Sequence, residues 1–362
     1  MSYCNDHPVD IVNNEEEIKI IVSDISVEEA DISVEEADLP KGFKFKTLGL
    51  RYLDEIYGLI NNHYVEDANT IIRLTYSKDF IYWYLKYIPD EFIIGLMSKK
   101  KLVGLITALF IDMVIYGKKV KVPYINFLCL QPKIRNVGLA PIMINEMKNR
   151  LTNKVSYALF HASKPVTHTN YFCTTKDFVV PINYQKLREV GFLTDDLQPL
   201  SKPNTNPLHL MIVSDIKIIV SKLNNFLEKF KIRPYFTDNT VNHFLLPKKN
   251  IVYSFVKKDS DNEITDFISV YKNYIYCLDH NKLISVAQLA FYFNETMSLT
   301  ELVINLIDKL SLYNFDQLTF RNIAENMDIN ITKFATYDQL YHILYNLNIK
   351  DTCPSQLCIY PF

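Results

Sequence analysis

The sequence lacks the long apolar run of a membrane protein and the signal pattern of a secreted one. Its longest apolar stretch, LVGLITALFI at residues 102–111, is about half the length of a membrane span. The N-terminus has no basic segment followed by an apolar one. The cysteines show no paired spacing, which suits reduced thiols; they are Cys4, Cys129, Cys173, Cys277, Cys353 and Cys358. We therefore expect a soluble, cytoplasmic protein without stable membrane insertion.

The sequence also lacks a strong charge of either sign. Its 39 Lys and Arg residues and 41 Asp and Glu residues leave a formal net charge of −2, whereas a general nucleic-acid binder normally shows a basic excess. Zinc-type spacing is missing as well, since His161, His168 and Cys173 match no strong pattern. We expect no metal, no nucleic-acid partner and a monomer.

The length of 362 residues, 48% of them hydrophobic, is sufficient for two domain cores. Residues 1–39 form an acidic tail in which ISVEEAD occurs twice; a heptad repeated only twice is too short for a coiled coil, so we expect disorder. We place a first domain at residues 40–203 and a second at residues 204–362. The polar, Pro-rich stretch at residues 197–208 marks the joint.

The stretch VPYINFLCLQPKIRNVGLAP, residues 122–141, predicts a central strand, a tight turn and the start of a helix. The strand is apolar on both faces. Gly138 is free to take a positive φ, and Pro141 suits the first turn of a helix over residues 139–151. Since helix N-termini attract anions, a phosphate site at this turn is the first functional hypothesis.

Helical spacing of apolar residues within residues 50–64 predicts a helix that ends near Asn61 and Asn62. A second helix is expected to begin after Ser77, its cap. Residues 92–110 then form two apolar strands around a charged turn, which gives three consecutive antiparallel strands with the one described above. The second half repeats this order: residues 223–230 resemble the end of the first helix, and strands lie within residues 251–271 and 284–294. It lacks the Arg-x-x-Gly turn, so the anion site is expected in the first copy alone.

The turn RNVGLA at residues 135–140 resembles that of acetyl-CoA-type N-acyltransferases. Five further segments make the resemblance more specific: HYVEDANTIIRLTYSKDF, YINFLCLQPKIRNVGLAP, PINYQKLREVGF, FLLPKKNIVYSFV and ITDFISVY resemble glycylpeptide N-myristoyltransferases in order and spacing, over most of residues 40–355. The resemblance implies an α/β fold of two tandem GNAT-like domains related by a pseudo-twofold axis, with mixed, mostly antiparallel sheets flanked by helices. It implies myristoyl transfer from myristoyl-CoA, a substrate, to an N-terminal glycine; no prosthetic group is implied.

The same resemblance implies the catalytic groups. The backbone N–H groups of Phe127 and Leu128 would hold the thioester oxygen, and such donors contribute on the order of 100- to 1000-fold each. The base would be a C-terminal carboxylate, carried by Phe362. Because an α-amino group has a pKa of roughly 8, a weak base suffices near neutral pH.

The resemblance also implies two sets of binding residues. The acyl-CoA set is Leu130, Lys133, Arg135, Asn136, Val137, Gly138, Leu139, Ala140 and Pro141. Here the chain departs from the family, because Val137 and Gly138 stand where the family has a Lys-Arg pair, and the aromatic segment that covers CoA is missing. The peptide set is Tyr64, Val65, Glu66, Asp67, Tyr76, His161, Asn183, Tyr271 and Asp338.

Several of these assignments have alternatives. Asn183 also fits a turn cap, and Tyr271 also fits the core of a strand. His161 begins His-Ala-Ser, where the family reads Thr-Ala-Gly, so an unusual peptide preference is expected. The RNVGLA turn alone would also fit a short-chain acetyltransferase, and loss of the basic pair would fit a catalytically silent binder of acyl-CoA or peptide.

Overall fold

The computed structural model describes residues 39–66, 71–152, 154–155, 157–166, 171–194, 197–347 and 349–362. The acidic repeat of residues 25–38, Asp67 and His168 lie outside the described residues. No disulfide joins the five described cysteines.

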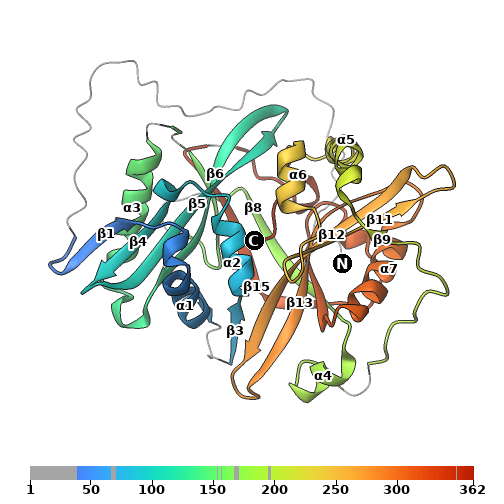
Figure 1. The fold of residues 1–362 in the computed structure, drawn as a ribbon, viewed down its shortest axis with the longest axis horizontal. Coiled ribbons are helices and arrows are strands. Elements are labelled where there is room, and N and C mark those ends of the chain that lie inside the picture. The colour runs from blue at the N-terminus through green and yellow to red at the C-terminus, as the bar shows by residue number, and fades with distance from the viewer. Residues whose placement is uncertain are drawn as a thin grey trace.

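The described strands form one 15-stranded sheet (Figure 1). Its main path runs β1-β4-β5-β6-β7-β15-β8-β14-β13-β12-β11-β9, with β2, β3 and β10 attached beside it. The strands are β1 (Phe43–Thr47), β2 (Val65–Glu66), β3 (Ile72–Thr75), β4 (Ile93–Ser98), β5 (Lys101–Ile115), β6 (Lys118–Leu130), β7 (Ala158–Ala162), β8 (Cys173–Pro181), β9 (His209–Leu210), β10 (Ile232–Pro234), β11 (Val252–Lys258), β12 (Ile264–Cys277), β13 (Lys282–Asn294), β14 (Gln317–Arg321) and β15 (Phe334–Tyr345).

The helices flank this sheet (Figure 1). They are α1 (Leu53–His63), α2 (Lys78–Leu85), α3 (Leu139–Leu151), α4 (Tyr184–Glu189), α5 (Ile216–Leu227), α6 (Asp238–Phe244) and α7 (Leu299–Leu312). Ser77 accepts a hydrogen bond from the Phe80 N–H at 3.0 Å, which confirms the predicted cap of α2. The predicted helix end within residues 223–230 is confirmed, since α5 begins at Ile216 and ends at Leu227.

The two halves exchange strands at their boundary. β4-β5-β6 and β11-β12-β13 are antiparallel triplets, and each is followed by a helix and a parallel strand, β7 or β14. The last strand of the first half, β8, pairs with β14, while the last strand of the second half, β15, pairs with β7. The halves therefore share one continuous sheet, and the internal repeat is confirmed in the order of its elements.

A single hydrophobic cluster extends across both halves. It includes Phe80 and Trp83 of α2, Phe244 of α6 and the last residue, Phe362. The C-terminus lies in the middle of the molecule, beside α2 and between the two halves (Figure 1). The chain end is therefore part of the core.

Candidate active site

β6 contains a bulge in its C-terminal half. One residue of β5, Ile106, opposes two residues of β6, Phe127 and Leu128. Phe127 has a left-handed φ of 53°. A bulge leaves the extra residue out of the hydrogen-bonded ladder and redirects the local backbone. Both predicted oxyanion donors therefore lie at a break in the sheet.

One of these two donors, the Phe127 N–H, is hydrogen-bonded to the side chain of Asn126. Its Oδ1 accepts from the Phe127 N–H at 2.8 Å and from the Tyr64 hydroxyl at 2.9 Å. Its backbone oxygen accepts from the Thr107 hydroxyl at 3.0 Å. Rotation of the Asn126 side chain would release the Phe127 N–H for a substrate oxygen. Leu128 lies on the more open side, with 36% of its surface exposed.

An aromatic cluster connects the bulge with the chain end. The Phe127 ring lies 5.2 Å from Tyr64, 5.4 Å from Tyr76 and 5.0 Å from Tyr84. The Tyr84 ring also lies 5.5 Å from the Phe362 ring. Burial raises the pKa of the three tyrosine hydroxyls, so they stay protonated at neutral pH. One ring therefore separates the bulge from the last residue.

Phe362 is buried, with 7% of its surface exposed. Its terminal oxygen accepts a hydrogen bond from the Tyr124 hydroxyl. The segment before it is fixed through the Cys358 N–H, which donates to the Ile232 oxygen of β10 at 2.8 Å. The prediction that the chain end is buried is thus confirmed.

The turn after β6 has the predicted conformation. Gly138 is the N-cap of α3, with a φ of 81°, and Asn136 is also left-handed, with a φ of 63°. No side chain caps α3, and its first turn has no acidic residue. An uncapped helix start leaves backbone N–H groups for an anion. Val137 is 62% exposed, Leu139 is buried, and Pro141 is exposed in the first turn.

Arg135 has structural partners in this turn. Its Nε donates to the Leu130 oxygen at 3.0 Å, and its Nη2 donates to the His63 oxygen at the end of α1. The guanidinium therefore ties the turn to α1. Lys133 is exposed beside it, and Ala140 is half-buried.

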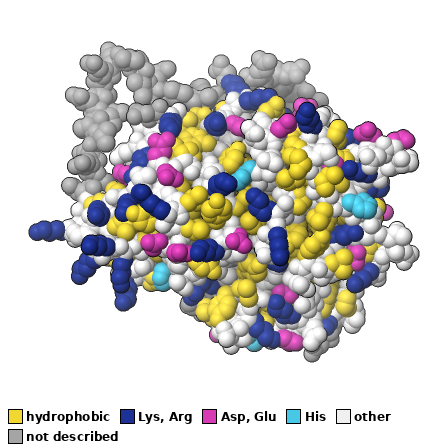
Figure 2. Space-filling model, in the orientation of Figure 1, with side chains coloured by type: hydrophobic (Ala, Val, Ile, Leu, Met, Phe, Trp, Pro, Cys, Tyr) yellow, Lys and Arg dark blue, Asp and Glu magenta, His cyan; other side chains and the backbone are white. Residues whose placement is uncertain are grey.

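Lysines gather at the end of the sheet that holds this turn. The N–H of Gln131 donates to the Val103 oxygen at 2.9 Å, which places the turn beside the β4–β5 hairpin tip. The tip consists of Lys99, Lys100 and Lys101, all exposed. Figure 2 shows Lys and Arg side chains crowding the edge where β1 and β4 lie in Figure 1. This edge can attract an anionic ligand.

Three of the predicted peptide residues lie near the bulge or the chain end. Tyr64 bonds Asn126, Tyr76 stacks on Phe80 at 4.9 Å, and the Nδ1 of His161 lies 3.0 Å from the Tyr124 hydroxyl.

Tyr271 also lies beside the chain end but is enclosed in the core, whereas Asn183 lies away from it. Asn183 caps α4, accepting from the Lys186 N–H at 3.2 Å, and Figure 1 shows α4 at the rim, apart from the chain end. Tyr271 is fully buried; its hydroxyl donates to the Phe244 oxygen at 3.0 Å, and its ring packs on Phe362. Asn183 therefore fits the alternative of a turn cap, and Tyr271 fits the alternative of a core residue. Val65 and Glu66 form β2, and Asp338 lies in an irregular part of β15.

Two polar residues beside Phe362 were not predicted from the sequence. Tyr124 precedes Asn126 by two residues on the same strand, so period-two spacing could have identified it. The Nη2 of Arg321, from β14, donates to the Pro361 oxygen at 3.4 Å. No local sequence signal connects Arg321 with the chain end, because the contact depends on the tertiary fold.

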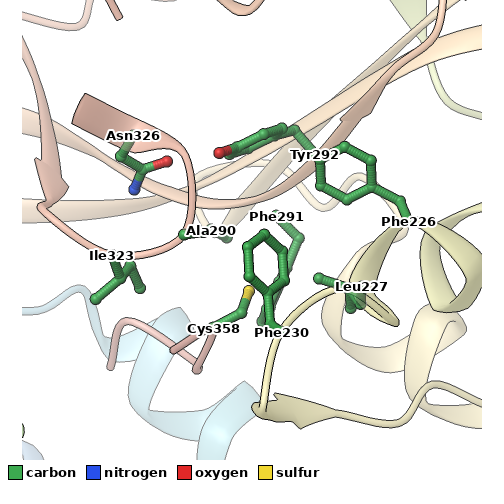
Figure 3. A pocket seen from close by; sticks show the side chains of 10 residues that line it. Phe226, Leu227, Phe230, Ala290, Phe291, Tyr292, Ile323, Asn326 and Cys358 are labelled. Carbon is green, nitrogen blue, oxygen red and sulfur yellow. The ribbon is translucent and has the colours of Figure 1, made fainter. Parts of the chain in front are cut away.

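The second half contains a corresponding bulge. Ser269 of β12 opposes both Ala290 and Phe291 of β13. This bulge borders a cavity of about 10 Å³, closed by side chains that include Phe230 and Cys358 (Figure 3). A cavity of that size holds about one water molecule, so it is too small for an acyl chain.

The described residues contain neither a membrane-spanning helix nor a grouped set of metal ligands. None of their helices is long and apolar enough to cross a membrane. Among them, no three His, Cys, Asp or Glu side chains are grouped as metal ligands.

Two family models match this chain: the N-terminal domain of myristoyl-CoA:protein N-myristoyltransferase over residues 22–173, and the C-terminal domain over residues 195–356. An Acanthamoeba polyphaga mimivirus protein assigned as a glycylpeptide N-tetradecanoyltransferase is 52% identical, over 88% of this chain and 90% of that protein. Glycylpeptide N-tetradecanoyltransferase 2 of Danio rerio is 30% identical, over 88% of this chain and 69% of that protein.

Solved structures show the same fold. Saccharomyces cerevisiae N-myristoyltransferase with bound myristoyl-CoA matches with a TM-score of 0.79 and 23% identity, over 87% of this chain and 85% of that one. The predicted fold of two tandem GNAT-like domains is confirmed. From the two matched domains and the 52% identical relative, this chain belongs to the myristoyl-CoA:protein N-myristoyltransferase family.

Proposed function

We propose that this chain transfers a myristoyl group from myristoyl-CoA to the amine of an N-terminal glycine, by direct attack in a ternary complex. The observation that carries the mechanism is the short distance between the β6 bulge and the chain end, which are both in ring contact with Tyr84. The new amide bond forms as the thioester C–S bond breaks, and CoA leaves as the thiol. The acyl chain would gain about 0.8 kcal/mol for each CH₂ group that it buries.

The base is the terminal carboxylate in a chain that ends at Phe362. It takes a proton from the glycine nitrogen during attack. Its placement in the core, next to the Tyr124 hydroxyl, supports this role, because a base acts only within hydrogen-bond reach of the amine.

The oxyanion is held by the N–H groups of Leu128 and Phe127. The bulge favours both donors, and the Phe127 N–H becomes available when Asn126 rotates. Such donors act strongly because they are already oriented when negative charge develops.

The phosphates of CoA bind at the uncapped start of α3, where Asn136, Val137, Gly138 and Leu139 offer backbone N–H groups. Lys133 and the three lysines of the β4–β5 tip supply positive charge in place of the family's missing basic pair. Arg135 acts indirectly, by holding the turn against α1.

We assign acyl-CoA binding to residues 40–203, and part of the peptide groove together with the base to residues 204–362. Tyr64, Tyr76, His161 and Tyr271 are the peptide-side candidates that lie near the reacting groups. The protein substrates would be cytoplasmic.

The test is transfer to a Gly-initiated peptide, followed by mass spectrometry. We expect a mass gain of one myristoyl group with the full chain, and a rate lower by about 100-fold or more when Phe362 is deleted, since general bases contribute about 10²–10⁴-fold. Acetyl-CoA should compete poorly with myristoyl-CoA. An unchanged rate after the deletion would refute Phe362 as the base, and acetyl transfer at an equal rate would refute the acyl preference.

A further inference from the structure

The Tyr124 hydroxyl joins two groups at the chain end. It donates to the terminal oxygen of Phe362, and it lies 3.0 Å from the Nδ1 of His161. A hydroxyl has one proton, and here that proton points to Phe362. His161 therefore carries its own proton on Nδ1 and donates it to the Tyr124 oxygen. The two hydrogen bonds form a chain of donors directed at Phe362.

The surroundings of His161 keep it neutral. Its ring packs against His342 with centroids 4.3 Å apart, and the His342 Nε2 lies 2.8 Å from the Thr175 hydroxyl. Burial, followed by the repulsion of His342 and Arg321, holds the pKa of His161 well below its usual range. A neutral imidazole has a single N–H, so the bond to Tyr124 selects its tautomer.

Arg321 places a buried positive charge next to the same chain end. Its side chain is 10% exposed, and its Nη2 donates to the Pro361 oxygen at 3.4 Å. Its Nε lies 3.4 Å from the Asp177 Oδ1, although within the described part of the chain neither atom has a partner of hydrogen-bond geometry. The guanidinium is thus only partly compensated and favours negative charge nearby.

We propose that Tyr124, oriented by His161, and Arg321 are positioning residues that hold the terminal oxygens of Phe362 where they can accept the glycine proton. This inference rests on the proposed function, in which Phe362 is the base. Tyr124 comes from β6, His161 from β7 and Arg321 from β14, so both halves fix the base. The glycine nitrogen loses one proton and Phe362 gains it, while Tyr124 and His161 keep theirs.

The test compares kcat, KM and the pH–rate profile of single variants. Tyr124→Phe should lower kcat about 10- to 100-fold, because a misplacement of about 1 Å can cost that much, while KM for both substrates changes less than about twofold. The acid limb of the profile should move to higher pH, since hydrogen bonds to a carboxylate stabilise its charged form. Arg321→Gln should lower kcat about tenfold, and Arg321→Lys should recover part of this loss.

The pair His161→Asn and His161→Gln separates positioning from packing. Asn carries its N–H near the place of Nδ1 and should retain most of kcat, whereas Gln carries it near Nε2 and should behave like Tyr124→Phe. Tyr253→Phe is a matched control: its buried hydroxyl accepts from the Asn250 N–H at 3.3 Å in a separate core. It should lose similar thermal stability and no activity.

The outcomes distinguish a failure of the positioning inference from a failure of the proposed base. If deleting Phe362 abolishes transfer while Tyr124→Phe keeps wild-type kcat and pH profile, the inference is wrong and the proposed base stands. Equal kcat for His161→Asn and His161→Gln, or a loss in Tyr124→Phe that falls entirely on KM, would also overturn it. If deleting Phe362 has no effect, the proposed base itself is wrong.

Discussion

The two halves of the chain share the same backbone break and differ in what lies in front of it. β6 bulges at Phe127 and Leu128, and β13 bulges at Ala290 and Phe291. The first bulge is one tyrosine ring away from Phe362. The second borders a cavity of about one water molecule, where the Tyr292 hydroxyl points toward Asn326 (Figure 3). The bulge is thus a property of the repeated fold, and its surroundings decide its use.

The helices that follow the two bulges begin differently. α3 starts at Gly138 without a side-chain cap or an acidic residue. α7 starts with a capping box, in which Ser298 accepts from the Glu301 N–H at 3.2 Å and the Glu301 carboxylate accepts from the Ser298 N–H at 2.9 Å. A carboxylate at a helix start fills the place that an external anion would take. The start of α7 is therefore capped by its own side chains, whereas the start of α3 remains open to an anion.

His243 of the second half and Trp83 of the first half form a contact that depends on pH. His243 of α6 stacks on Trp83 of α2 at 5.0 Å, and its oxygen accepts from the Trp83 Nε1 at 3.0 Å. Burial, and then the charges of Lys248 and Lys86, lower the pKa of His243 to about 4. His243 therefore takes up a proton near pH 6.5 in the unfolded chain, but only near pH 4 in the folded chain.

We expect the free energy of unfolding to fall by about 2 kcal/mol between pH 6.5 and pH 4 through His243, after allowance for its partial exposure. Chemical denaturation across this range measures the slope. His243→Gln should flatten it, leaving the contributions of His161 and His342, whose pKa values are also lowered by burial. Equal slopes for the wild type and His243→Gln would contradict this account.

Local chemistry made most elements predictable from sequence. The Ser77 cap, the left-handed Gly138 and the helix from Leu139 to Leu151 each depend on neighbouring residues, and the structure has all three. The repeated strand order was visible for the same reason. The start of α5 was not predicted, although Asp215, a residue type common at helix N-caps, directly precedes Ile216.

Long-range contacts limited the prediction of the site. The exchange of β8 and β15 between the halves involves pairings such as Gln317 with Pro181, which no local pattern encodes. The hydrogen bond from Arg135 to His63 could not be predicted, because the two residues are far apart in sequence. Arg321 was not predicted for the same reason, since its neighbour is the chain end. Tyr124 differs, because its period-two spacing from Asn126 on β6 was a local signal.

Adding a carboxylate to α3 would make its start resemble that of α7. Pro141 occupies the third helical position of α3, as Glu301 does in α7. Pro141→Glu should raise KM for myristoyl-CoA about tenfold, or about 1.4 kcal/mol, because the carboxylate repels a phosphate. KM for the peptide and kcat should change little. Glu301→Gln is the matched change in the other half and should leave KM for myristoyl-CoA at the wild-type value; a rise there, or none in Pro141→Glu, would break the comparison.

The smallest expected effect concerns the two hairpin tips, which carry opposite charge. The β4–β5 tip is Lys99, Lys100 and Lys101, whereas residues 259–263 of the β11–β12 tip include Asp259, Asp261 and Glu263. If the basic tip replaces the missing basic pair of the phosphate turn, the double variant Lys99→Glu/Lys100→Glu should raise KM for myristoyl-CoA about three- to fivefold at low salt. The effect should shrink toward 0.5 M salt, because exposed charges are screened over a few ångströms there.

Asp259→Lys/Asp261→Lys should leave KM unchanged at either salt concentration. An effect of Lys99→Glu/Lys100→Glu that is independent of salt would indicate a folding defect at the tip, and equal effects of both double variants would show that charge at the first tip has no special access to the CoA phosphates.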